Sequence, residues 1–319
     1  MSADVSAGGP AAPARPEPDP VVAVLGATAT GKSGLALELA VRLGGEIVNA
    51  DASQLYRGMD VGTAKVPREQ RRGIAHHQLD VLEVTDEANV AAYQPSARAD
   101  LADIRSRGAR PIVVGGSGLY ARALLDRLEI PPTDPAVRAR WEREFAQRGV
   151  EHLYVVLQER DPVAAERIEP ANGRRIVRAL EVIELTGRPF SATLPARELM
   201  EPTVLLGLRA ARAVLHERIA ARVQRMWSGG LLAEVARLDA VGLRRGRTAS
   251  RALGYAQALA HLDGELSATQ AQEATVVATR RFARRQEAWF GADPRIVWIE
   301  HDAPDLVDRA LAAAASAER

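Results

Sequence analysis

One glycine-rich segment constrains this chain more than any other part of its sequence. Residues 26–33 read Gly26-Ala27-Thr28-Ala29-Thr30-Gly31-Lys32-Ser33 and fit the pattern G-x-x-x-x-G-K-[ST] in full. An apolar run at 21–25 precedes the segment, and residues 34–43 follow it with leucines at helical spacing. A strand, a glycine-rich turn and a helix in this order form a phosphate-binding loop, because backbone N–H groups and the helix N-terminus surround an anion. We therefore expect residues 26–33 to bind a phosphate group, as in nucleotide-binding and ATP-binding proteins.

Two side chains of this loop carry its chemistry. Lysine is a compact, flexible point charge that suits a terminal phosphate, whereas an arginine fork would not fit there. The choice is informative because Lys32 and Lys65 are the only lysines among the 42 cationic residues. The hydroxyl group of Ser33 is a candidate ligand for Mg²⁺, which we expect as the cofactor.

The order of apolar and amphipathic segments predicts an α/β fold: a P-loop core with a parallel sheet flanked by helices, plus an inserted, mainly helical domain. Strands are expected at 21–25, 46–50, 111–114 and 204–208. Helices are expected at 34–43, 89–107 and 306–315, and across 213–290 with glycine breaks at 229–230 and 242–246. We assign residues 21–126 and 198–319 to the core and 127–197 to the insertion. Within the insertion, helices are expected at 137–147 and at 161–186, the second with a break near 170–173. Residues 1–20 contain five prolines and are predicted to be a disordered tail.

Composition narrows the class of protein further. The chain of 319 residues has no cysteine, which excludes disulfides, cysteine-ligated zinc and thiol catalysis. It has no apolar run of about 18 residues and no pattern of a secretory signal. We therefore expect a cytoplasmic protein that does not contact a membrane, and we expect it to be a monomer.

A long polar loop after the second predicted strand is more specific. Residues 51–65 read Asp51-Ala-Ser-Gln-Leu-Tyr-Arg-Gly-Met-Asp-Val-Gly-Thr-Ala-Lys65, and we call this segment the signature loop. It resembles the D-S-x-Q-x-Y-x-G-M-D-I-G-T-A-K signature of the tRNA dimethylallyltransferase (tRNA isopentenyltransferase) family. The resemblance continues in register from residue 21 to residue 290, with family-like stretches at 74–80, 113–120, 161–168, 174–182, 215–225 and 279–290. The sequence departs from the family pattern at Ala27, where proline is usual, and at 170–173, which replaces Pro-Asn-Asp. Ser33 and Ser117 replace threonine and keep a hydroxyl group, whereas Ala52 replaces serine and loses it, so no role of that side chain is carried over.

The resemblance implies a reaction and roles for particular residues. The dimethylallyl group of dimethylallyl diphosphate would move to N6 of the adenosine 3′ of the tRNA anticodon, with diphosphate as the leaving group. Residues 26–33 would hold the diphosphate, and Asp51 would act as the base that accepts the amine proton. Ser117 would donate a hydrogen bond to the departing oxygen, and Arg222 would reach the diphosphate as a charged fork. A metal-site role for Asp51 and a helix-capping role for Ser117 remain open at this point.

Several basic segments are candidates for binding tRNA, because cations next to aromatic residues suit an RNA backbone and unstacked bases. One lies in the insertion, one near residues 244–255, and one on the helical stretch 279–290. The residues predicted to contact tRNA are Asp51, Ala52, Ser53, Gln54, Arg138, Arg174, Arg175, Arg178, Arg251, Tyr255, Arg281, Arg284 and Arg285. The alternative for any single patch is a solvated helix face in an arginine-rich chain.

Three other functions remain possible from the sequence. A P-loop kinase or ATPase would hydrolyse a nucleoside triphosphate and need no isoprenoid. A related prenyltransferase would act on free adenine nucleotides instead of tRNA. A catalytically silent RNA-binding protein could keep the fold, although the set Lys32, Ser33, Asp51 and Ser117 argues against it.

Overall fold

The core of the protein is a six-stranded parallel sheet. The structure, a computed structural model, describes residues 19–193 and 197–316, so residues 1–18 of the predicted tail lie outside the described residues. The sheet has the order β3-β2-β4-β1-β5-β6. Its strands are β1 (Val21–Gly26), β2 (Gly45–Asn49), β3 (His76–His77), β4 (Arg110–Gly115), β5 (Thr203–Arg209) and β6 (Val297–Glu300). The four expected strands are therefore confirmed, whereas the sequence did not indicate the two edge strands β3 and β6.

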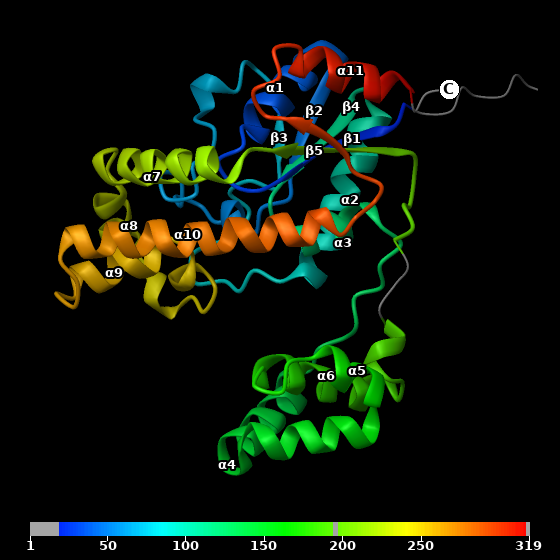
Figure 1. Cartoon of the computed structure of the whole chain (residues 1–319), viewed down its shortest axis with the longest axis vertical. Coiled ribbons are helices and arrows are strands. Elements are labelled where there is room, and N and C mark those ends of the chain that lie inside the picture. Colours follow the sequence, from blue (N-terminus) through cyan, green and yellow to red (C-terminus); the bar gives the residue numbers. More distant parts are fainter. Residues whose placement is uncertain (1–18, 194–196, 317–319) are drawn as a thin grey trace, which may run out of the picture.

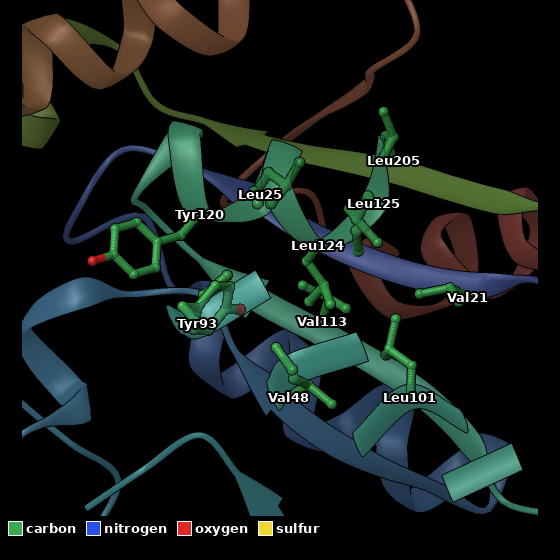
Figure 2. Packing of buried hydrophobic residues seen from close by; sticks show 14 of the residues in the cluster. Val21, Leu25, Val48, Tyr93, Leu101, Val113, Tyr120, Leu124, Leu125 and Leu205 are labelled. Carbon is green, nitrogen blue, oxygen red and sulfur yellow. The ribbon is translucent and has the colours of Figure 1, made fainter. Parts of the chain in front are cut away.

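Helices cover both faces of the sheet, as the apolar strands require (Figure 1). Along β1, Val22 and Val24 pack against α1 (Lys32–Leu43) and α11 (Leu306–Ser316). The alternate residues of β1 pack on the other face against α2 (Val90–Ser106) and α3 (Gly118–Leu125). Figure 2 shows this second face, where Leu101, Leu124 and Tyr120 lie over the strands.

A helical layer follows the fifth strand. It consists of α7 (Arg212–Ser228), α8 (Leu231–Ala240), α9 (Tyr255–Leu262) and α10 (Ala268–Gly291), with short 3₁₀ turns η4 (Leu243–Arg245) and η5 (Ala249–Arg251). The helical stretch expected at 213–290 has one further break, because Ser267 caps a new helix by accepting a hydrogen bond from the Gln270 N–H. This layer packs on Tyr56 and Met59 of the signature loop, so the loop is part of a hydrophobic core.

The remaining helices lie apart from the sheet, at the lower end of the molecule in Figure 1. They are α4 (Pro135–Arg160), α5 (Pro162–Arg167) and α6 (Gly173–Thr186). The element α4 consists of two helical pieces, because Gly149 has a non-helical conformation with φ 81° and ψ 172°, and the first piece contains the helix expected at 137–147. The group has its own core around Trp141, Leu153 and Leu180.

The other short elements are η1 (Ala52–Leu55), η2 (Arg68–Gln70) and η3 (Phe190–Thr193). In the part of the chain that the structure describes, no helix has the length and hydropathy of a membrane span.

Candidate active site in a row of three cavities

The functional residues predicted from the sequence meet at the carboxyl edge of the parallel sheet. The phosphate loop follows β1, Asp51 lies two residues after β2, and Ser117 lies two residues after β4. These strands are adjacent in the sheet, so their ends place the three segments side by side. This edge is where open α/β sheets bind ligands.

The phosphate loop is held from outside by two later helices. Gly26 has φ +130°, and a Cβ atom on it would lie 2.6 Å from the Leu208 carbonyl oxygen, so the sharp turn after β1 requires glycine. The Gln286 side chain of α10 accepts a hydrogen bond from the Thr28 N–H at 2.9 Å. Arg218 of α7 donates to the Ala29 carbonyl at 2.7 Å. The loop shape therefore depends on contacts with residues about 190 or more positions away in sequence.

Lys32 lies beside a cavity of about 470 Å³ that also borders Ser33, Arg218, Arg222 and Arg225. Its Nζ atom donates to the Ala27 carbonyl oxygen at 2.6 Å. Burial and, to a smaller extent, repulsion from Arg222 lower the pKa of Lys32 to about 8, and attraction to Asp51 opposes both effects. An anionic ligand in this cavity would reverse the shift, because it favours the protonated amine.

The donor set around this cavity fits Mg²⁺ only in combination with a phosphate ligand. Ser33 lines the cavity, and the described residues contain no group of three or more histidine, aspartate or glutamate side chains that could hold a metal ion by themselves. Mg²⁺ commonly binds through one or two protein groups and the oxygens of a substrate phosphate. The Ser33 hydroxyl group is suited to such a shared site.

Asp51 lies in a second cavity of about 240 Å³, which it lines together with Thr28, Ser53, Thr63 and Arg222. One carboxylate oxygen of Asp51 accepts a hydrogen bond from the Ser53 N–H at 3.0 Å. The backbone N–H of Asp51 donates to the Asn49 side chain. These bonds fix the carboxylate group at the start of η1, and the side chain is half-buried with access to the cavity.

Ser117 does not act as the side-chain cap of α3. Its Oγ atom accepts a hydrogen bond from the Ala52 N–H at 3.1 Å, and α3 has no side-chain cap. The capping alternative is therefore wrong, and Ser117 instead ties the end of β4 to the signature loop. The residue does not appear among those that line the cavities of about 470 and 240 Å³. Its Oγ hydrogen has no acceptor in the described hydrogen bonds and is available for a ligand.

Two arginines join the cavities. Arg222 borders both the Lys32 cavity and the Asp51 cavity, and it donates to the Thr63 carbonyl at 3.2 Å. Burial lowers the pKa of Arg222 below its ordinary value, although Asp51 acts in the opposite direction. Arg251 borders the Asp51 cavity and also a third cavity of about 630 Å³ between the core and the inserted helices. We call this third cavity the cleft. The three cavities form a row from Lys32 through Asp51 to the cleft.

The signature loop is held by a buried carboxylate that the sequence did not single out. Glu234 of α8 is 2% exposed and accepts hydrogen bonds from the N–H groups of Asp60, Val61 and Gly62 and from the Tyr255 hydroxyl group. Lys65 is also buried and donates to Asp60, Asp80 and the Tyr56 carbonyl. The lysine in this motif therefore has a structural role.

Gln286 is the second residue that the sequence reading missed. It is 5% exposed, and besides the Thr28 N–H it contacts the Gly116 carbonyl, to which its Nε2 atom donates at 2.9 Å. It thus connects the phosphate loop with the loop that carries Ser117. The sequence feature that could have indicated a role for Gln286 is its position on the buried face of α10, between the apolar residues Ala283 and Phe290. For Glu234 the signal was a glutamate between Leu231 and Val235 on the buried face of α8.

The predicted tRNA-contacting residues separate into groups. Arg138, Arg174, Arg178 and Arg251 line the cleft, whereas Arg175 is exposed and does not line it. Ser53 lines the Asp51 cavity and Gln54 donates to the Thr63 carbonyl. Arg281 and Arg284 border a separate groove between α7 and α10, and Arg285 lies over the Phe282 ring. Ala52 uses its backbone N–H to bond Ser117.

Tyr255 requires a correction. Its side chain is fully buried, where it packs against Gly62 and donates to Glu234. Burial raises the pKa of Tyr255, and the neighbouring Glu234 charge adds to this. A direct contact of this ring with tRNA is therefore not supported, because no part of it reaches a surface.

Comparisons with known proteins agree with this geometry. The family described as IPP transferase matches residues 54–293. The chain is 59% identical over 291 residues to the tRNA dimethylallyltransferase of Pseudarthrobacter chlorophenolicus, covering 91% of this chain and 97% of that protein. It is also 59% identical over 297 residues to the same enzyme of Thermobifida fusca, covering 92% of this chain and 93% of that protein.

Solved structures give the same result. The full-length tRNA isopentenylpyrophosphate transferase of Bacillus halodurans superposes with a TM-score of 0.69 at 33% identity, covering 94% of this chain and 98% of that one. A eukaryotic dimethylallyltransferase, solved acting on tRNA, superposes with a TM-score of 0.77 at 25% identity, covering 93% of this chain and 77% of that one.

Proposed function

The chain belongs to the IPP transferase family, and from this premise we propose that it is a tRNA dimethylallyltransferase. It transfers the dimethylallyl group of dimethylallyl diphosphate to N6 of the adenosine 3′ of the anticodon and releases diphosphate. The proposal includes Mg²⁺ as the cofactor and a cytoplasmic monomer as the working form.

The row of three cavities is the observation that carries this proposal. A basic cavity with a phosphate loop lies at one end, a carboxylate lies in the middle, and an arginine-lined cleft lies at the other end. A diphosphate ester and an RNA base that enter from opposite ends would meet beside Asp51. A kinase needs no such cleft, and a free nucleotide would not use one of about 630 Å³ that extends onto the inserted helices.

The phosphate-loop end promotes departure of the leaving group. As the allylic carbon–oxygen bond breaks, negative charge grows on the diphosphate. Lys32 and Arg222 border its cavity and would neutralise that charge more strongly in the transition state than in the ground state. The Ser117 hydroxyl group would donate to the departing oxygen. Mg²⁺, held by Ser33 and the diphosphate oxygens, would supply further positive charge to the leaving group.

Asp51 completes the transfer. The adenine amine is a weak nucleophile because its lone pair is delocalised into the ring. A carboxylate that accepts a hydrogen bond from the amine orients it, and then takes one proton as the new nitrogen–carbon bond forms. The electron pair of the broken carbon–oxygen bond leaves with diphosphate.

The test is to incubate the protein with unmodified tRNA, Mg²⁺ and dimethylallyl diphosphate, and to analyse the nucleosides by mass spectrometry. We expect N6-dimethylallyl-adenosine in the anticodon loop and an equal amount of diphosphate. A matched reaction with AMP in place of tRNA should give far less product. Turnover of ATP without any prenylated nucleoside would support the kinase instead.

A further inference from the structure

Phe145 is an aromatic side chain that the proposed reaction leaves without a role. It lies on α4 and borders the cleft, and 37% of its surface is exposed. The chain has only four phenylalanines, and the hydrophobic cluster inside the inserted helices forms without this one. The hydrophobic cluster of the insertion therefore does not account for a phenylalanine at this position.

The first turn of α6 supports the ring from one side. A Cβ atom on Gly173 would lie 2.5 Å from Phe145 Cε2 and 2.6 Å from Cζ, so the ring lies against a residue that has no side chain. This contact limits the rotation of the ring, and Phe145 remains one of the residues that border the cleft. A ring fixed in this way loses little freedom when a flat ligand stacks on it.

The surroundings of the ring are basic. Five arginines and two glutamates line the cleft. Arg138 and Arg178 share the buried carboxylate of Glu181. Within residues 19–193 and 197–316, no carboxylate pairs with the other three, which are Arg174, Arg247 and Arg251. These three unpaired guanidinium groups outnumber the two glutamates of the cleft, and together with the exposed ring they favour an anionic ligand with a flat apolar part.

We propose that Phe145 is the stacking platform for an unpaired base of the tRNA anticodon loop, next to the adenosine that enters the Asp51 cavity. Unpaired RNA bases bind proteins by stacking on aromatic rings, while arginines hold the adjacent phosphates. Arg251 borders both the cleft and the Asp51 cavity, so a loop that reaches Asp51 with one base has neighbouring bases in the cleft. This inference rests on the proposed function, and it adds a recognition residue outside the reaction centre.

The experiment compares Phe145→Leu and Phe145→Trp with the wild type on an anticodon stem-loop RNA. Leucine keeps the apolar contact but cannot stack, so we expect the KM for the RNA to rise roughly 5- to 100-fold. Tryptophan should keep the wild-type KM or lower it. The KM for dimethylallyl diphosphate should stay unchanged in both variants. A stem-loop with 2-aminopurine next to the reacting adenosine reports stacking directly, and its fluorescence change on binding should be lost with leucine.

Salt dependence separates stacking from charge. Stacking releases no counterions, so Phe145→Leu should leave the slope of log Kd against log salt unchanged, whereas Arg174→Ala should lower it by about 1. Val155→Ala is the matched control, since Val155 is exposed on the part of α4 beyond the Gly149 kink and does not line the cleft. Circular dichroism should show wild-type helicity for every variant.

Three results would overturn the inference. The first is a Phe145→Leu variant with the wild-type KM for the RNA and the wild-type fluorescence change. The second is a lower slope of log Kd against log salt in the Phe145→Leu variant. The third is an apolar peptide that competes for the cleft while the stem-loop RNA does not. A wild-type protein that prenylates no RNA would instead refute the proposed function. The two failures are therefore distinguishable.

Discussion

Asp51 is the residue on which the proposed chemistry depends most. We expect Asp51→Asn to lower kcat by roughly 10²- to 10⁴-fold, the range for a lost general base. The asparagine oxygen can still accept the Ser53 N–H, so the local turn should persist. The KM for dimethylallyl diphosphate should change much less, because one anion does not help to bind another. Steady-state and single-turnover kinetics on tRNA measure both quantities. Loss of Mg²⁺-dependent diphosphate binding with intact single-turnover chemistry would make Asp51 a metal-site residue.

Lys32 predicts a pH dependence. Burial and Arg222 lower its pKa to about 8 in the ligand-free protein, so the amine is a cation below that pH and neutral above it. Diphosphate binds the cation, and its charge raises the pKa of the bound amine. We therefore expect kcat/KM for dimethylallyl diphosphate to fall as pH rises through about 8, and kcat to fall only at higher pH. Kinetics between about pH 6.5 and 10 test this. The Lys32→Met variant should have a lower kcat/KM for dimethylallyl diphosphate at every pH, and its kcat/KM should not fall near pH 8. A similar fall in that variant would assign the titration to a group other than Lys32.

At the scale of elements, α8 and the signature loop form one unit through Glu234. This carboxylate accepts four hydrogen bonds, three of them from consecutive backbone N–H groups. The substitution Glu234→Gln replaces one acceptor oxygen with an NH₂ group, which cannot accept a hydrogen bond from the donors that face it. We expect a loss of unfolding free energy of about 1–3 kcal/mol, because buried donors lose their partner. We also expect lower kcat/KM, since the loop presents the Thr63 carbonyl to Arg222.

Urea unfolding and tRNA kinetics measure these two effects of Glu234→Gln. Tyr255→Phe is the matched variant, because it removes one of the four donors and leaves the backbone bonds in place. We expect Tyr255→Phe to lower the free energy of unfolding by about 1 kcal/mol. Unchanged stability in both variants would mean that the loop holds its shape without α8.

At the scale of the whole molecule, the cleft between the core and the inserted helices is the proposed binding site for tRNA. Arg174 lies on the insertion and Arg247 on the core, and both line the cleft. We expect the double variant Arg174→Ala/Arg247→Ala to raise the KM for tRNA far more than that for dimethylallyl diphosphate. The slope of log Kd against log salt should fall by about 2, one for each phosphate contact. Filter binding over a salt series measures it.

The pair Arg281→Ala/Arg284→Ala serves as a comparison, since these residues border the groove between α7 and α10. Weaker tRNA binding by that double variant would show that the tRNA-binding surface extends beyond the cleft. A wild-type salt slope in the cleft variant would contradict the cleft as the tRNA site.

The sequence by itself determined the features that depend on near neighbours. A strand, a glycine-rich turn and a helix start within 12 residues make a phosphate loop, and β1, α1 and α2 have the predicted bounds to within two residues. The position of Asp51 after an apolar strand also follows from local pattern, because parallel strands end at one edge of a sheet. β3 and β6 were not predicted, since two and four residues are too short to show a period.

Only the tertiary structure decided which side chains face a ligand and which support the fold. Arg138 and Arg178 share Glu181, and Tyr255 supports a loop, although sequence pattern alone treated each as a possible tRNA-contacting residue. Gln286 and Glu234 act across about 170 residues or more. Hydrogen-bond partners that lie so far apart in sequence are set by how whole helices and strands pack, and the local spacing of residues does not indicate them. The row of cavities that joins Lys32, Asp51 and Phe145 arises from the same packing.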